Sequence, residues 1–132
     1  MRFPDWRDRL HMQIDLARKR EAQFGVHDCL QFPALCIEAI TGINPATQFG
    51  EYSTELGAAK LMAEFGGVSG ILTNAFGEPV APNWARAGDV VTLTVLGLET
   101  GGICNGTTVV FAAKPGIAFL TRELIEKAWL ID

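Results

Sequence analysis

The pattern of apolar positions changes character about two thirds of the way along the chain. Up to residue 76, apolar residues recur at spacings of three and four, which predicts amphipathic helices. In the first of these, Phe3, Trp6, Leu10, Ile14 and Ala17 form one apolar face, which lies on the protein's own core or on a partner. The expected helices start at Asp5, Cys29, Thr54 and Ser69, and they end before Gly25, Gly42, Gly66 and Gly77.

The remaining third predicts strands. Residues 90–95 are rich in branched side chains, and Asn105-Gly106 is a strong hairpin signal between residues 102–104 and 107–112. We expect another strand over 117–120, a short helix over 121–127 and an extended segment over 129–131. Helices followed by strands predict one α+β domain over residues 1–132, with N-terminal helices packed on a C-terminal antiparallel sheet.

Composition excludes several classes of function. With 132 residues and 48% apolar letters, the chain can bury one proper core. Its net charge of -4 argues against a nucleic-acid partner. No apolar run is long enough to span a membrane, and residues 1–9 resemble a charged helix rather than a signal peptide. We therefore expect a protein made in the cytoplasm.

The three cysteines are too few and too irregularly spaced for a disulfide framework or a metal centre. We expect free thiols, no metal and no other cofactor. Cys36 and Cys104 fall at positions expected to be buried, where cysteine packs as a small apolar residue.

Cys29 occupies a more suggestive position. Asp28 is the natural N-cap of the second helix, which places Cys29 at the first helical position. There the helix dipole and free backbone N–H groups would favour a thiolate and supply donors for an oxyanion. Pro33 lacks the N–H that would bond the Cys29 carbonyl, so an irregular helix start is expected. Alternatively, Asp28 is only a cap and Cys29 only a packed side chain.

The order of these motifs resembles the NlpC-type, papain-fold cysteine peptidases of bacterial cell walls. The resemblance consists of Phe24-Gly25 with Asp28-Cys29, then Ala87-Gly88-Asp89-Val90-Val91, then Gly102-Ile103-Cys104-Asn105-Gly106. It implies a papain-like fold with Cys29 as the nucleophile of a peptidase or amidase.

A second resemblance is to small proteins of tailed bacteriophages and prophages. It adds Asp5-Trp6, His27-Asp28-Cys29, Thr41-Gly42 and Ala128-Trp129 to the shared residues. It implies a virion protein of the distal tail, beside the tail hub and other tip proteins. The expected localisation is the tail tip, after synthesis in the host cytoplasm.

The catalytic partners that the peptidase resemblance requires are missing. Its general base, a histidine two residues before the Gly-Ile of the hairpin, is replaced by Thr100, and its orienting residue by Phe111 or an apolar neighbour. The chain contains only His11 and His27. We interpret His11 as a surface or structural residue, and a His27–Cys29 dyad as the one way to supply a base. Without that dyad, Cys29 is a vestigial nucleophile.

Three functions therefore remain open. They are a structural tail-tip protein with an inactive peptidase fold, an active peptidase that degrades peptidoglycan during genome delivery, and a module that binds cell-wall peptides without cutting them. Trp84 and Arg86 are candidate interface residues, because tryptophan and arginine are frequent interface anchors. Trp84 could equally close the core beneath its loop, and Trp6 and Trp129 are expected in the core.

Overall fold

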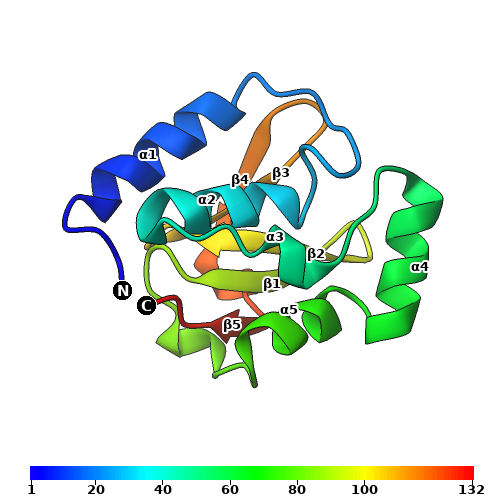
Figure 1. Ribbon diagram of the computed structural model, residues 1–132. Coiled ribbons are helices and arrows are strands. Elements are labelled where there is room, and N and C mark those ends of the chain that lie inside the picture. The colour runs from blue at the N-terminus through cyan, green and yellow to red at the C-terminus, as the bar shows by residue number, and fades with distance from the viewer.

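The computed structural model describes residues 1–132 and places the helices before the sheet, as the periodicity predicts (Figure 1). The helices are α1 (Trp6–Ala17), α2 (Gln31–Thr41), α3 (Ala46–Phe49), α4 (Glu55–Phe65) and α5 (Val68–Phe76). The strands are β1 (Val90–Val95), β2 (Leu98–Cys104), β3 (Thr108–Ala112), β4 (Ile117–Thr121) and β5 (Lys127–Trp129). Two short 3-10 helices, η1 (Pro82–Trp84) and η2 (Arg122–Leu124), connect these parts.

Local chemistry sets several of the helix ends. Thr54 caps α4, its side-chain oxygen accepting a 3.0 Å hydrogen bond from the Gly57 N–H. Gly42 and Gly66 follow α2 and α4 in the left-handed conformation, which glycine adopts without steric cost. None of the helices combines the length and apolar character that crossing a bilayer requires.

The expected end of the first helix and the helix expected over 121–127 are wrong. The first helix ends at Ala17, because the Arg18 N–H bonds the Asp15 carbonyl three residues back and the chain then turns toward the sheet. The helix expected over 121–127 is only the three-residue η2. Residues 127–129 instead form β5, whose pairing with β1 outweighs a weak helical pattern.

The five strands form one antiparallel sheet in the order β4-β3-β2-β1-β5. Side chains alternate between its faces, so that Val90 and Val91 enter two separate cores. The larger core lies between the sheet and α1, α2 and α5. The smaller lies on the other face, where Ala85 and Ile125 cover it. The predicted α+β class, with helices on an antiparallel sheet, is confirmed at this level.

The tryptophans divide between the core and the surface. Trp129 is buried, and its indole N–H donates a 2.9 Å hydrogen bond to the Gly77 carbonyl. Trp6 is half-buried, with the guanidinium groups of Arg2 and Arg7 stacked 4.3 and 4.4 Å from its ring centre. The expectation of a core position therefore holds fully for Trp129 and only in part for Trp6.

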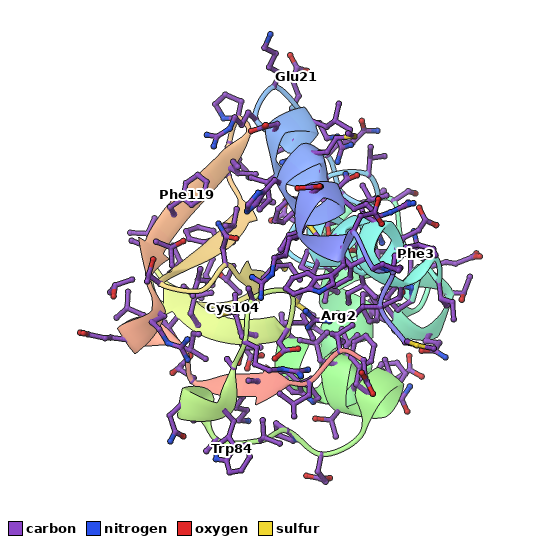
Figure 2. The ribbon with its side chains drawn as sticks, turned by 90° about the vertical axis from the view of Figure 1, so that its left-hand side faces the viewer. Arg2, Phe3, Glu21, Trp84, Cys104 and Phe119 are labelled. Atoms are coloured by element: carbon purple, nitrogen blue, oxygen red, sulfur yellow. The ribbon has the colours of Figure 1, made fainter.

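Asp89 ties both chain termini to the start of the sheet. Its buried carboxylate accepts hydrogen bonds from Arg2 (2.9 Å), from the Arg86 N–H (2.8 Å) and from the Ile131 N–H (2.8 Å). Figure 1 shows the two ends of the chain side by side, and Figure 2 labels Arg2. This buried charge is fully compensated, so it fixes the relative positions of three distant segments.

Candidate functional site

The turn before α2 is organised by Asp28. One carboxylate oxygen, Oδ1, accepts hydrogen bonds from the N–H groups of Leu30 (2.9 Å) and Gln31 (2.8 Å). The other, Oδ2, accepts from the Gly25 N–H (2.8 Å) and the Tyr52 hydroxyl (2.7 Å). The hydrogen bonds predicted from backbone N–H groups to Asp28 are therefore present, but Leu30 and not Asp28 is the N-cap of the regular helix, so Asp28 caps the turn that precedes it.

Cys29 lies in this turn and not at the first position of the α-helix. The regular helix begins at Gln31, two residues later than expected. Pro33 is the physical reason, because it has no N–H with which to bond the Cys29 carbonyl. That carbonyl lies against the backbone of Gly101 in β2, at a point where any Cβ atom would overlap it. Gly101 is therefore required for the close approach of the strand to the turn.

The surroundings of Cys29 favour the thiol over the thiolate. Burial raises the pKa of Cys29 to about 11, against a lowering by hydrogen bonds from the backbone of Gly101 and of Cys29 itself. The negative charges of Asp28 and Glu99 contribute to this same rise. The N–H groups of the first turn already bond Asp28. The expected thiolate at a helix N-terminus is therefore wrong for this structure.

His27 is buried, and its ring hydrogen-bonds to Gly116 and not to Cys29. Its Nε2 lies 2.6 Å from the Gly116 carbonyl oxygen, so Nε2 carries the proton and donates it. Its Nδ1 is buried without a hydrogen-bond partner, and no hydrogen bond joins His27 to Cys29. His27 thus braces the turn against the β3–β4 connection, and the structure does not form the His27–Cys29 dyad.

A cavity of 440 Å³ opens beside Cys29. It lies where β2 and β3 diverge, because these strands pair only through Ile103 with Val110 and Cys104 with Val109. Residues 98–100 of β2 line one side, and residues 112–114 line the other. His27 and Cys29 also line it, and Val68 and Met62 add apolar surface.

The cavity contains the position where the peptidase resemblance requires a general base. Thr100 lines it, and the Thr100 hydroxyl donates a 3.2 Å hydrogen bond to the Leu98 carbonyl. Ala112 and Ala113 line the opposite wall, whereas Phe111 belongs to the core on the other face of the sheet. The strands therefore bring the expected positions together with Cys29, but the side chains there carry no base.

Three residues of the site were missed by sequence reasoning. Tyr52 bonds Asp28 from a loop that carries no motif, and its pKa is raised first by burial and then by the Asp28 charge. Glu99 accepts a 3.1 Å hydrogen bond from the Ser69 N–H at the start of α5. Gly101 had a usable signal, since glycine inside a strand marks a close approach of backbone.

The remaining candidate residues lie outside the cavity. Trp84 is 65% exposed on η1, which settles its position in favour of the surface (Figure 2). Arg86 pairs with Asp89 while about half of its side chain stays in solvent. Arg122 donates to the Pro82 and Ala85 carbonyls and holds this loop in place. Among the other candidates, His11 is exposed, and Cys36 and Cys104 are buried free thiols.

Comparisons with known proteins add one match. A family model described as "Domain of unknown function (DUF6950)" matches residues 1–131. No curated protein matches the chain.

Proposed function

The chain belongs to the DUF6950 family, a domain of unknown function, and we propose that it is a non-catalytic relative of the NlpC-type cysteine peptidases. One observation carries the proposal. The cavity beside Cys29 has Thr100 and two alanines where a base and its orienting residue would stand, and the Nε2–H of the nearby His27 donates a hydrogen bond to the Gly116 carbonyl.

The chemistry of amide cleavage explains why the missing base matters. A thiol must lose its proton to attack a carbonyl carbon, and the leaving amine must gain one. A positioned general base contributes about 10²- to 10⁴-fold to such a reaction. Cys29 has no hydrogen-bonded base, and burial raises its pKa to about 11. The site therefore supports a protein that has kept the shape of a peptidase cleft without its reactivity.

In this proposal the chain is a structural component of the distal tail of a tailed bacteriophage. The shared residues Asp5-Trp6, His27-Asp28-Cys29 and Ala128-Trp129 support this setting through their resemblance to small tail-tip proteins. Trp84 supports it because an exposed tryptophan on a braced loop is a suitable anchor for a protein partner such as the tail hub. Arg86 extends the same surface.

Two measurements test the proposal. Purified chain incubated with peptidoglycan sacculi should release no soluble fragments, and Cys29→Ala should behave like the unaltered protein. Mass spectrometry of purified tailed particles should find the chain in a fixed ratio to the hub protein. Cleavage that depends on Cys29 would overturn the inactive site, and absence from mature particles would overturn the tail assignment.

A second candidate, an active peptidase or amidase, rests on a specific observation. The backbone amides of Gly101 and of Cys29 itself lower the pKa of the Cys29 thiol against the larger effect of burial, and such amides beside the sulfur would suit an oxyanion. Under this alternative, Cys29→Ala abolishes release from sacculi, whereas Cys36→Ala, a change at a buried cysteine of the same core, preserves it.

The third candidate, recognition of cell-wall peptides without cleavage, rests on the size of the cavity. Its 440 Å³ lies within the range of small-ligand sites. Calorimetry with a soluble stem peptide should then show binding that Thr100→Trp abolishes by filling the cavity. Binding without turnover distinguishes this module from both other candidates.

A further inference from the structure

The two edges of the sheet differ in whether another segment pairs with them. At one edge, β5 is covered by Val80, whose N–H donates a 2.8 Å hydrogen bond to the Ala128 carbonyl. At the other edge, β4 pairs with β3 on one side only. In Figure 2, β4 and the labelled Phe119 lie at the left-hand boundary of the molecule, with no other element beyond them. The β4 edge is therefore open.

The hydrogen bonds at the two ends of β4 identify its free backbone groups. The Arg122 N–H donates to the Thr107 carbonyl, and the Ala113 N–H donates to the Gly116 carbonyl. Backbone groups alternate in direction along an antiparallel strand. The even-numbered residues of β4 therefore direct their N–H and C=O groups toward β3. Ile117, Phe119 and Thr121 direct theirs outward, away from the sheet. None of these three makes a backbone hydrogen bond outside the sheet.

Nothing in the sequence of this strand blocks further pairing. Residues 117–121 read Ile-Ala-Phe-Leu-Thr, without charge, proline or glycine. Protein edge strands that avoid association commonly carry a lysine, a proline or a bulge. Phe119, at the centre, is 39% exposed. The edge is thus a template for another extended strand.

We propose that the strand added here is β4 of a second copy of this chain, paired antiparallel across a two-fold axis perpendicular to the sheet. Phe119 then faces the partner's Phe119, and Ile117 faces the partner's Thr121. The outward N–H and C=O groups of these three residues hydrogen-bond to those of the other copy. The helices of both copies then lie on the same face of the joined sheet. The result is one continuous ten-stranded sheet.

Charge at the ends of β4 favours this self-pairing over pairing with an unrelated strand. Lys114 precedes the strand, Glu123 follows it, and both are exposed. Antiparallel pairing brings the Lys114 end of each copy to the Glu123 end of the other, so opposite charges meet at both ends. A single surface that complements itself is what a two-fold dimer requires.

The test measures molar mass by light scattering and sedimentation over a range of protein concentrations. We expect the mass to rise from 14.3 kDa toward twice that value as concentration increases. Phe119→Glu should hold the protein at the monomer mass, because two carboxylates would face each other across the axis. Leu16→Glu, the same kind of change at an exposed leucine of α1, should leave the dimer intact.

A second variant keeps the test decisive if Phe119→Glu fails to fold. Thr121 already has φ -66, so Thr121→Pro fits the backbone and removes an outward N–H without touching β3 pairing. It should also abolish the dimer. A monomer at every concentration, or a dimer that survives both edge variants, would overturn the proposal.

Discussion

Asp28 and Asp89 both gather hydrogen bonds from distant segments, but they leave their surroundings in opposite electrostatic states. Asp89 is fully buried and paired with the guanidinium groups of Arg2 and Arg86. Asp28 receives only neutral donors, three backbone N–H groups and the Tyr52 hydroxyl. The Asp28 charge therefore stays uncompensated beside Cys29, where it raises the pKa of the thiol.

Asp89 is thus a carboxylate that stabilises the fold, whereas Asp28 is a carboxylate that disfavours a reactive thiolate. A cysteine nucleophile needs a nearby cation or base to hold it as a thiolate. In this molecule Arg2 and Arg86 pair with Asp89, whereas the Cys29 thiol lies within electrostatic range of two carboxylates, Asp28 and Glu99. The same kind of residue thus stabilises the fold in one place and keeps a thiol protonated in the other.

The largest effect on stability is expected when the buried ion pair between Asp89 and Arg2 is broken. Asp89→Ala leaves the Arg2 guanidinium without its carboxylate in a nearly buried position, and we expect a loss of about 3 kcal/mol in the free energy of unfolding. Urea unfolding measures it. Asp5→Ala, which removes an exposed carboxylate paired with Arg9, is the control and should leave stability unchanged. Equal losses in both variants would contradict this account of Asp89.

A smaller effect follows from neutralising the other aspartate. Asp28→Asn keeps an oxygen that accepts from Leu30 and Gln31 but removes the charge, at a cost of about 2 kcal/mol in stability. Because a negative charge disfavours a thiolate, the pKa of Cys29 should fall. The pH profile of Cys29 alkylation should then move to lower pH. Glu38→Gln, at an exposed site on α2, should leave that profile in place, and an unmoved profile in Asp28→Asn would refute the role of its charge.

The smallest effect concerns Tyr52. Tyr52→Phe removes the 2.7 Å hydrogen bond to Asp28 and should cost about 1 kcal/mol near neutral pH. Burial raises the pKa of Tyr52 above its unfolded value of about 10, so its contribution is complete below pH 10 and is lost as the pH rises further. Urea unfolding at pH 8 and above pH 10 should therefore show a shallower alkaline loss in Tyr52→Phe than in the unaltered protein. A steeper loss would contradict this sign.

Much of the fold follows from local sequence signals. Helical periodicity, the glycines after α2 and α4, and the Asn105-Gly106 hairpin locate most elements and the α+β class. The structure also confirms the effect of Pro33 on the start of α2. The bounds of the short β5, Lys127–Trp129 in place of the extended segment expected over 129–131, could not be predicted in this way, because β5 is held as a strand by pairing with β1 and Val80 rather than by its own residues.

The site was predicted less completely, since its electrostatics depend on contacts between distant segments. The Asp28 cap is a local motif and was predictable. The pKa of Cys29 depends on burial by β2 and on Glu99, which lies 70 positions along the chain from it. The partner of His27 is likewise a carbonyl in the β3–β4 turn, 89 positions away. No spacing rule reveals such partners.

The most direct test of the central claim is the pH dependence of iodoacetamide alkylation at Cys29, mapped by peptide mass spectrometry. With a pKa of about 11, roughly one thiol in a thousand is ionised at pH 8. The account predicts slow labelling near neutral pH, with a rate that continues to rise through pH 10. Rapid labelling that reaches a plateau below pH 8 would show an activated thiolate and would contradict it.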